Sequence, residues 1–244
     1  MDDGHERGRL SFEPRATTGE AGGRDEALGL ADMTGRDGHL YVPDTAEAGA
    51  PVLVFLHGAT GSGRSHSRAA LAAADRYGVI LVSPDSRAPM TWDLIATQGF
   101  GPDPAFIDRM LDAVADRVDA DLSRIAVGGV SDGASYALSI GLTNGDLFPA
   151  VIAFSPGFIA LAETNGKPRV YVSHGTADPI LPIDQCGRPL VRGMRREGYE
   201  VCFRVFEGGH TVPPEWADEG LRWWLTGVAS VGADLGGVGG RSEL

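Results

Sequence analysis

Runs of apolar residues alternate with segments of helical periodicity along most of the chain. The apolar runs are continuous, which is typical of strands that are covered on both faces. They occupy residues 51–58 (PVLVFLHG), 77–85 (YGVILVSPD), 124–131 (RIAVGGVS), 150–157 (AVIAFSPG), 168–175 (PRVYVSHG) and 199–209 (YEVCFRVFEGG). These runs predict the central strands of a mainly parallel sheet.

The segments between these runs carry apolar residues at intervals typical of helices. They are residues 67–77 (SRAALAAADRY), 103–118 (DPAFIDRMLDAVADRV), 133–144 (GASYALSIGLTN), 186–198 (CGRPLVRGMRREG) and 214–225 (PEWADEGLRWWL). Alternating strands and helices predict an α/β protein with a three-layer α/β/α fold. Two earlier segments, RLSFEPR (9–15) and GHLYVP (38–43), are expected to add an antiparallel edge, which gives about eight strands.

A single domain is expected over residues 9–227. Residues 1–8 and 228–244 are polar or rich in Gly, and they are predicted to be flexible tails. No insertion between the predicted strands is long enough for a large cap domain. Ligands of such sheets bind beyond the C-terminal ends of the strands, so the loops after the apolar runs are the candidates for chemistry.

Composition and charge exclude several classes of partner. A formal net charge of −12 and a pI of about 4.8 argue against nucleic acid or an anionic membrane. No apolar run approaches the roughly 18 residues of a membrane-spanning helix. The acidic start MDDGHERGRL is not typical of a signal peptide, so a cytoplasmic location is expected. Cys186 and Cys202 could form one disulfide, but they provide no disulfide scaffold or cysteine-based zinc site.

The segment GVSDG (129–133) matches the G-x-S-x-G pattern of a nucleophile elbow. The pattern alone is weak evidence, because 35 of the 244 residues are Gly. Its position is stronger evidence, since Ser131 follows a predicted strand and precedes a predicted helix. A strained turn there would place the hydroxyl at the positive end of the helix dipole, and Gly129 and Gly133 would avoid collisions with neighbouring elements. The alternative is that Ser131 only caps the helix.

A nucleophilic serine needs a base and an orienting acid. His210 follows the last predicted strand in FEGGHTVPP, and Asp178 follows the preceding strand in SHGTADPILPI. The order Ser131, Asp178, His210 is that of an α/β-hydrolase and differs from the chymotrypsin and subtilisin orders. Asp184 is the nearest alternative acid and His174 the alternative base. We interpret His174 as a buried residue that hydrogen-bonds local backbone.

An oxyanion hole requires backbone N–H groups, so side-chain identity matters little there. One donor is predicted to be Asp132, directly after the nucleophile. The second is predicted to be Ala59, in the loop after VLVFLHG, with Thr60 as the alternative one residue further on. The Asp132 side chain could disfavour anionic substrates or point to solvent.

The loop GATGSGRS (58–65) supports a different hypothesis, a nucleotide-binding protein. It approaches the phosphate-binding pattern G-x-x-x-x-G-K-[ST], with Arg64 where Lys belongs, and Asp85 could serve a magnesium site. The Lys of that pattern acts as a compact point charge, for which Arg is not equivalent. This hypothesis also leaves the Ser–Asp–His series unexplained.

Several of these segments together resemble the serine esterases of the α/β-hydrolase superfamily, most of all the phospholipase/carboxylesterase and polyhydroxybutyrate-depolymerase-like groups. The matching segments are FLHGATG, GVSDGAS, HGTADPILP, and FEGGH followed by a helix ending in LRWWL. The likeness covers roughly residues 39–225. Acyl-protein thioesterases usually carry Gln where this chain has Asp132, and secreted depolymerases carry signal peptides, binding domains and disulfides. The chain departs from both subgroups.

The resemblance implies a carboxylic ester hydrolase that requires no metal and no organic cofactor. The resemblance does not specify the substrate. The lack of a long insertion for a cap domain predicts an open, shallow site for small-molecule esters with small or short acyl groups, with aryl esters as a further candidate. Candidate pocket residues are Trp92, Phe100, Phe158, Ile180 and Leu181, and core packing is the alternative role for each aromatic residue. The sequence does not choose among carboxylesterase, feruloyl-type esterase, thioesterase and lipid deacylase, and it specifies no oligomeric state. A hydrolase-fold protein that binds without catalysis is the remaining alternative.

Overall fold

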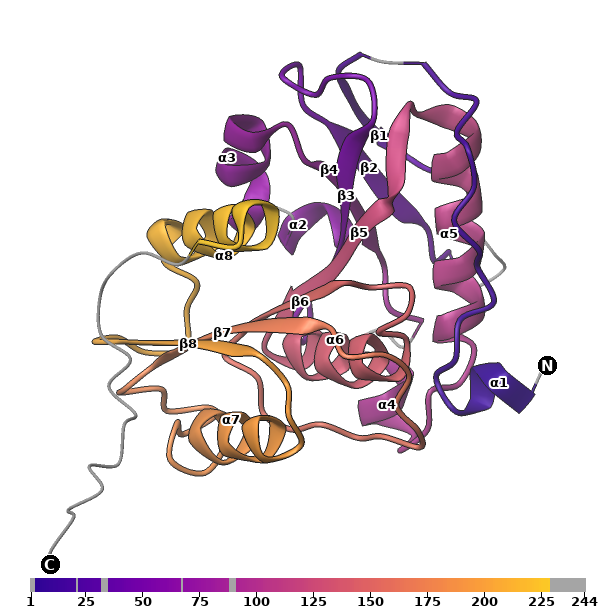
Figure 1. Ribbon diagram of the computed structural model, residues 1–244. Coiled ribbons are helices and arrows are strands. Elements are labelled where there is room, and N and C mark those ends of the chain that lie inside the picture. The colour runs from indigo at the N-terminus through magenta and orange to yellow at the C-terminus, as the bar shows by residue number, and fades with distance from the viewer. Residues whose placement is uncertain (1–2, 21, 32–34, 67, 88–90, 229–244) are drawn as a thin grey trace, which may run out of the picture.

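The computed structural model describes residues 3–20, 22–31, 35–66, 68–87 and 91–228. Within these residues, eight strands form one sheet in the order β1-β2-β4-β3-β5-β6-β7-β8 (Figure 1). The strands are β1 (Arg24–Ala27), β2 (Gly38–Val42), β3 (Ala50–Leu56), β4 (Ile80–Pro84), β5 (Ala120–Val130), β6 (Ala150–Phe154), β7 (Arg169–Gly175) and β8 (Val201–Phe206). The pairs β1–β2 and β2–β4 are antiparallel, and all the others are parallel. The predicted sheet is confirmed.

The two faces of β3 explain why its apolar run is continuous. Val52, Val54 and Leu56 belong to one hydrophobic core, and Leu53 and Phe55 belong to a second core on the other face. All five side chains are at most 1% exposed. Because successive side chains of a strand point to opposite faces, a strand covered on both sides needs an apolar residue at every position.

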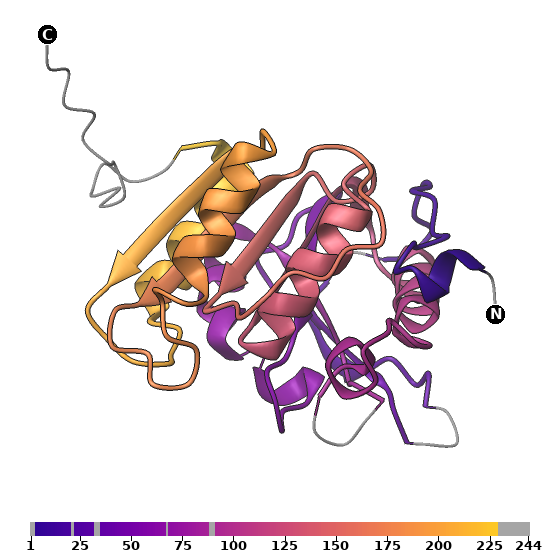
Figure 2. The same ribbon diagram turned by 90° about the horizontal axis from the view of Figure 1, so that it is seen from below.

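Helices cover both faces of the sheet, as the alternation predicts (Figures 1 and 2). The longer ones are α3 (Arg68–Tyr77) and α8 (Pro214–Thr226) on one face, and α5 (Asp103–Arg117), α6 (Asp132–Thr143) and α7 (Gly187–Arg196) on the other. Short helices are α1 (Asp3–Glu6), α2 (Gly63–His66) and α4 (Asp93–Ala96). Among the described residues, no helix is both long and apolar enough to cross a membrane.

The segment 9–15 differs from its predicted role as an early strand. It runs along α5 as an extended strap outside the sheet (Figure 1). Leu10 and Phe12 are buried, and their N–H groups donate to the side chains of Asn144 (2.8 Å) and Asp108 (3.0 Å). The apolar–polar alternation therefore reflects burial against helices, whose side chains supply the acceptors that a neighbouring strand would otherwise provide.

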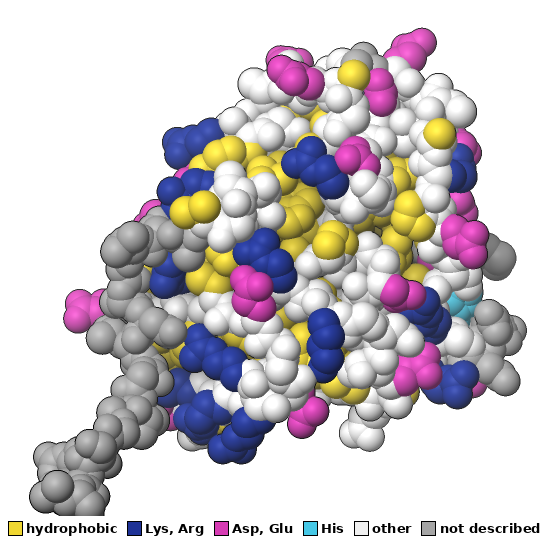
Figure 3. Space-filling model, in the orientation of Figure 1, with side chains coloured by type: hydrophobic (Ala, Val, Ile, Leu, Met, Phe, Trp, Pro, Cys, Tyr) yellow, Lys and Arg dark blue, Asp and Glu magenta, His cyan; other side chains and the backbone are white. Residues whose placement is uncertain are grey.

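The two predicted tails have different outcomes. Residues 3–6 form α1, and His5 Nε2 lies 2.8 Å from the Asp108 carboxylate on α5, so the described part of segment 1–8 is docked. At the other end, residues 229–244 lie outside the described residues. Cys186 and Cys202 are free thiols. On the face shown in Figure 3, basic side chains are interspersed with acidic and apolar ones.

The register of the parallel strands brings three loops to one edge of the sheet. Val130 at the end of β5 pairs with Phe154 of β6, which pairs with Ser173 of β7. Gly175 at the end of β7 pairs with Phe206, the last residue of β8. The loops that begin after β5, β7 and β8 are those that carry residues 131, 178 and 210.

Candidate active site

Ser131 occupies a strained turn between β5 and α6. Its backbone angles are φ 58° and ψ −119°, and its N–H donates to the carbonyl oxygen of Phe154 at 2.9 Å. A non-Gly residue in such a region costs about 1–3 kcal/mol and persists only where its surroundings impose it. The Ser131 side chain makes no cap hydrogen bond to α6. An ordinary helix-capping role is therefore not supported.

The two glycines of GVSDG are required by close packing. A Cβ atom at Gly129 would lie 2.6 Å from the carbonyl carbon of Gly133 and 2.7 Å from the carbonyl oxygen of Leu56. A Cβ atom at Gly133 would lie 2.2 Å from the same Leu56 oxygen. Any larger residue at either position would push α6 away from β3 and β5. The glycines therefore avoid collisions with neighbouring elements, as the sequence analysis predicts.

His210 and Asp178 are joined by a short hydrogen bond. His210 Nδ1 lies 2.6 Å from Asp178 Oδ2, and the two residues are 32 positions apart in the sequence. The His210 side chain is 20% exposed, whereas the carboxylate of Asp178 is fully buried. The imidazole therefore has one nitrogen held by the acid, which leaves Nε2 for proton transfer.

The environment of Asp178 favours its ionised form. Burial acts to raise its pKa, but hydrogen bonds from His210 and from the backbone N–H groups of Leu181 and Ile180 outweigh burial, and the pKa lies below its ordinary value. Both backbone donors reach Oδ1, at 2.8 Å from Leu181 and 2.9 Å from Ile180. Asp178 is thus a charged, fixed acceptor at neutral pH.

The alternative acid and base have other partners. Asp184 forms an ion pair of 2.9 Å with Arg188 one helical turn away, and its side chain is 82% exposed. His174 is fully buried, and its Nε2 lies 2.7 Å from the carbonyl oxygen of Leu181. The interpretation of His174 as a buried residue bonded to local backbone is confirmed.

The loop after β3 lies directly against the elbow. A Cβ atom at Gly58 would be 3.3 Å from Ser131 Cβ, and Thr60 adopts a positive φ of 62°. The neighbouring His57 is 1% exposed and is held through both ring nitrogens, because Nε2 accepts from the N–H of Ser86 (2.9 Å) and Nδ1 donates to the Gly58 carbonyl (2.7 Å). This loop is where Ala59 is predicted to supply an oxyanion donor.

The side chain of Asp132 is held by a partner that the sequence analysis missed. Its Oδ2 accepts a hydrogen bond of 2.6 Å from Thr91 Oγ1. The two residues are 41 positions apart, and nothing in the spacing of the sequence signals the contact. The carboxylate is therefore anchored by Thr91, an interaction that neither of the two roles considered for it includes.

Two of the five predicted pocket residues are core residues. Trp92 is fully buried, donates from Nε1 to the His57 carbonyl oxygen at 2.8 Å, and stacks on Tyr136 with ring centroids 5.1 Å apart. Phe100 is 4% exposed and packs on the other side of the same core, 5.9 Å from the Tyr136 ring. The expectation that they line an open pocket is wrong, because buried aromatic surface and a paired indole N–H stabilise the core instead.

The other three predicted pocket residues lie nearer the surface. Phe158 and Leu181 are half-buried, and Ile180 is 66% exposed. Leu181 is close to the start of α6, because a Cβ atom at Gly157 would lie 3.0 Å from Leu181 Cδ2, and the N–H of Gly157 donates to Ser135 Oγ at 2.9 Å. Leu181 thus approaches the elbow helix, while Ile180 extends into solvent beside Asp178.

The loop GATGSGRS makes contacts that differ from those of a phosphate cradle. The N–H of Gly63 donates to Asp85 Oδ1 at 2.8 Å, and Asp85 Oδ2 accepts from the N–H of Asp37 at 3.3 Å. Ser62 and Ser65 hydrogen-bond each other. Asp85, the candidate for a magnesium site, thus fixes the loop to the start of β2.

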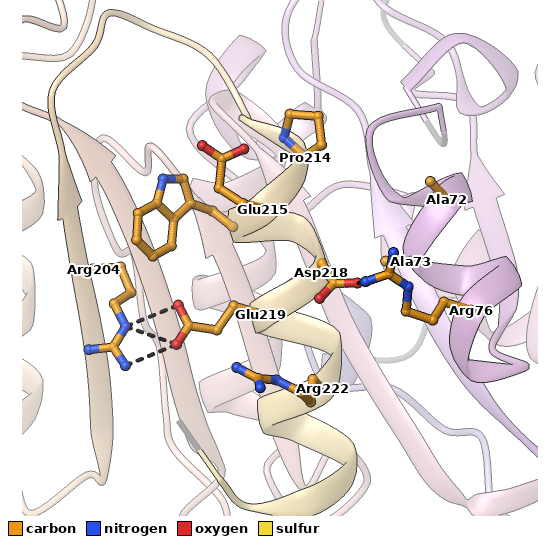
Figure 4. Close-up of a pocket in the computed structure, with 10 residues that line it drawn as sticks. Ala72, Ala73, Arg76, Arg204, Pro214, Glu215, Asp218, Glu219 and Arg222 are labelled. Atoms are coloured by element: carbon orange, nitrogen blue, oxygen red, sulfur yellow. Dashed lines mark hydrogen bonds and ion pairs between the residues drawn. The ribbon is translucent and has the colours of Figure 1, made fainter. Parts of the chain in front are cut away.

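A hollow of about 790 Å³ lies between α3 and α8, away from these loops. Figure 4 shows that its walls carry both guanidinium and carboxylate groups. Arg204 and Glu219 form a buried pair at 2.9 Å, and Arg76 pairs with Asp218 at 2.7 Å. These two ion pairs are formed between side chains that line the hollow.

Comparisons with known proteins point to esterases. No family model matches the chain. The chain is 27% identical over 243 residues to feruloyl esterase B of Thermothelomyces thermophilus, covering 89% of this chain and 79% of that protein. It is 29% identical over 168 residues to a probable feruloyl esterase C of Aspergillus niger, covering 65% and 60%, and 30% identical over 124 residues to acetylxylan esterase A of Emericella nidulans, covering 48% and 41%. The chain thus spans 60% and 41% of these last two relatives.

Solved structures share the fold at low sequence identity. Esterase PE8 superimposes with a TM-score of 0.64 at 23% identity, over 75% of this chain and 95% of that chain. An S-formylglutathione hydrolase from Agrobacterium tumefaciens gives 0.66 at 18%, over 83% and 95%. An acetyl xylan esterase from Aspergillus awamori gives 0.59 at 19%, over 80% and 99%.

The sheet order, the elbow after β5 and these structural likenesses define an α/β-hydrolase fold. The chain therefore shares the fold of the α/β-hydrolases, and the relatives of similar sequence named above are feruloyl and acetylxylan esterases.

Proposed function

We propose that this chain is a carboxylic ester hydrolase that forms an acyl-enzyme on Ser131. The observation that carries the proposal is the 2.6 Å hydrogen bond between His210 Nδ1 and Asp178 Oδ2. It lies at the sheet edge where Ser131 is held in a strained elbow. A base, an orienting acid and a nucleophile on three loops of one edge are the parts that acyl transfer requires.

The proposed reaction has two steps. His210 Nε2 takes the proton of Ser131 as Oγ attacks the ester carbonyl, and it returns that proton to the leaving alcohol. A water molecule then gives a proton to His210 and attacks the acyl-enzyme, which releases the acid and restores Ser131. Throughout, the charged Asp178 holds the Nδ1–H tautomer and stabilises the imidazolium.

Charge on the tetrahedral intermediate is proposed to be stabilised by the backbone N–H groups of Ala59 and Asp132. Two observations support this assignment. The loop after β3 touches the elbow at Gly58, and Asp132 opens α6, whose N-terminus favours negative charge. Each such donor contributes about 3 kcal/mol to transition-state stabilisation.

The proposed substrates are esters with small or aryl acyl groups. The relatives are named for feruloyl and acetylxylan esters, an aryl and a short acyl group respectively. In this chain, the half-buried Leu181 and Phe158 provide apolar surface near the elbow, and the exposed Ile180 borders the acid. An apolar but open wall suits a planar aryl or a short acyl chain better than a long one.

The test is kcat/KM on p-nitrophenyl esters from acetyl to palmitoyl and on methyl ferulate, for the wild type and Ser131→Ala. We expect the wild type to be fastest on acetyl or feruloyl esters and the variant to fall to background. A fluorophosphonate should label the wild type once, and Ser131→Ala should remain unlabelled. A wild type that is neither labelled nor active on any ester would refute the proposal.

A further inference from the structure

A second histidine contacts the acid that orients His210. His174, near the end of β7, has a fully buried side chain whose Nε2 lies 3.4 Å from Asp178 Oδ2 and 2.7 Å from the Leu181 carbonyl oxygen. A carbonyl oxygen can only accept, so Nε2 of His174 must carry the proton. That N–H donates to the Leu181 carbonyl, and the Asp178 carboxylate is its second, longer contact.

Both oxygens of Asp178 are thereby surrounded by donors. Oδ1 accepts from the N–H groups of Ile180 and Leu181, and Oδ2 faces Nδ1 of His210 and Nε2 of His174. The carboxylate cannot turn about its axis without losing at least one of these contacts.

The other side of the His174 ring keeps it neutral. Its Nδ1 is buried without a hydrogen-bond partner among the described residues, and a Cβ atom at Gly187, the first residue of α7, would lie 2.6 Å from it. A second proton there would have no acceptor and would face a helix N-terminus. Burial, together with the nearby His210, lowers the pKa of His174 despite the favourable effect of Asp178. The Cys186 thiol, directly before Gly187, has a pKa raised by burial and by Asp178, so it stays neutral too.

We propose that His174 is a positioning residue for the esterase reaction, because its Nε2–H holds Asp178 Oδ2 and shares the carboxylate charge between two imidazoles. This inference rests on the proposed function. It assigns His174 a role beyond packing. That role is indirect, because His174 reaches the reacting atoms only through Asp178 and His210. Glycine at position 187 leaves the space that the ring needs.

Loss of the His174 donor has two consequences. Asp178 is then held by three donors instead of four, so His210 spends less time in the productive orientation and kcat falls. The carboxylate charge also concentrates on His210, so the acidic limb of the kcat/KM profile moves to higher pH. Neither consequence follows from a residue that only fills space.

The test compares two neutral amides at one position. In His174→Gln the amide nitrogen reaches the place of the imidazole Nε2, whereas in His174→Asn it is one carbon too short. We expect His174→Asn to lose about 10- to 100-fold in kcat, with KM changed less than about 3-fold, as is typical when an outer partner of a reacting group is removed. The acidic limb of the kcat/KM profile should move up by about half a pH unit. His174→Gln should keep most of the wild-type kcat and pH profile.

Two further readouts separate the role from folding and from the proposed function. The downfield proton resonance of the His210–Asp178 hydrogen bond should shift or broaden in His174→Asn and remain in His174→Gln, whatever the activity. The inference would be overturned if wild type and His174→Asn had the same kcat, the same acidic limb of the kcat/KM profile and the same resonance. It would also be overturned if both variants lost equal activity in proportion to their melting temperatures. A wild type that shows this resonance without hydrolysing any ester would instead refute the proposed function.

Discussion

Asp132 Oδ2 and Thr91 Oγ1 are joined by a hydrogen bond of 2.6 Å, which ties the first residue of α6 to the loop after β4. The residue after Thr91 is Trp92, whose Nε1 donates to the His57 carbonyl just before Gly58. One short segment therefore contacts both backbone regions that are proposed to form the oxyanion hole. Thr91 and Trp92 therefore help the elbow to fix the two regions in which the oxyanion hole is proposed.

Thr91→Val should loosen one side of that link. Valine keeps the volume of threonine but removes the hydroxyl that donates a hydrogen bond to Asp132. A hydrogen bond to a charged group contributes about 1.5–3 kcal/mol. We expect the free energy of unfolding to fall by about 1–2 kcal/mol, and kcat to fall several-fold with little change in KM. Thr91→Ser, which keeps the hydroxyl, is the matched control. Urea denaturation and ester kinetics measure both quantities, and equal kinetics for the two variants would contradict this role.

Trp92→Phe should loosen the other side. Phenylalanine keeps an aromatic ring near Tyr136 but cannot donate to the His57 carbonyl, so the loop after β3 loses one anchor. We expect kcat to fall about 10-fold, because a small displacement of an oxyanion donor costs transition-state stabilisation. Phe100→Leu is the control, since Phe100 packs on the same Tyr136 ring without contacting that loop. If Phe100→Leu lost as much kcat as Trp92→Phe at equal stability, the loss could not be assigned to the hydrogen bond with the His57 carbonyl.

Asp178 should couple stability to pH. Its pKa is lowered in the folded protein, so its ionised form stabilises the fold above the ordinary range of aspartate, and that contribution disappears as pH falls through the folded pKa. We expect the free energy of unfolding of the wild type to exceed that of Asp178→Asn at pH 7, and the difference to shrink steadily below pH 4. Guanidinium denaturation of both proteins at a series of pH values measures this difference. In the same variant, kcat should fall about 10⁴-fold, as when the acid of such a triad loses its charge. A difference that is constant with pH would show that the interactions of Asp178 do not depend on its charge.

The central strands and the order of the candidate triad could be predicted from the sequence because each rests on local features. A continuous apolar run marks a doubly covered strand, and each of Ser131, Asp178 and His210 stands in a loop after such a run. The triad roles and the cytoplasmic location stay predictions. What the sequence did not reveal depends on contacts between distant segments.

Two examples show why these contacts escape a single sequence. Leu10 and Phe12 alternate with polar residues as a strand would, but alternation does not tell whether the apolar side meets a sheet or a helix. Trp92 stands in a loop beside the predicted site, as a pocket residue might, but its indole N–H finds the His57 carbonyl inside the core. Each position is decided by a partner 35 or more residues away.

Glu219 on α8 should be important for stability and not for catalysis. Its carboxylate pairs with Arg204 of β8 at 2.9 Å, and both side chains are at least 93% buried. Removing one partner leaves a buried charge, which typically costs 3–5 kcal/mol, so Glu219→Ala should be strongly destabilised. The double variant Arg204→Met with Glu219→Leu should recover much of the loss, because it removes both charges. Denaturation curves test this, and kcat measured on the folded fraction should remain within about 2-fold of the wild type.

Asp108 should control whether the N-terminal strap stays on α5. Its two oxygens accept from the N–H groups of Ser11 (2.8 Å) and Phe12 (3.0 Å), and Oδ2 also contacts His5. Asp108→Ala leaves these backbone donors unsatisfied, at a cost of about 1–3 kcal/mol for each buried group. We expect a lower melting temperature and rapid proteolytic cleavage within residues 3–20.

Asp112, one turn further along α5, provides the matched control for the strap. Its side chain is 59% exposed and pairs with the half-exposed guanidinium of Arg15 at 3.3 Å. Such surface pairs contribute about 0–1 kcal/mol, so Asp112→Ala should leave both stability and protease resistance nearly unchanged. Limited proteolysis with mass spectrometry locates the cleavage. Resistance that is equal in the two variants would show that Leu10 and Phe12 hold the strap by burial alone, without the carboxylate of α5.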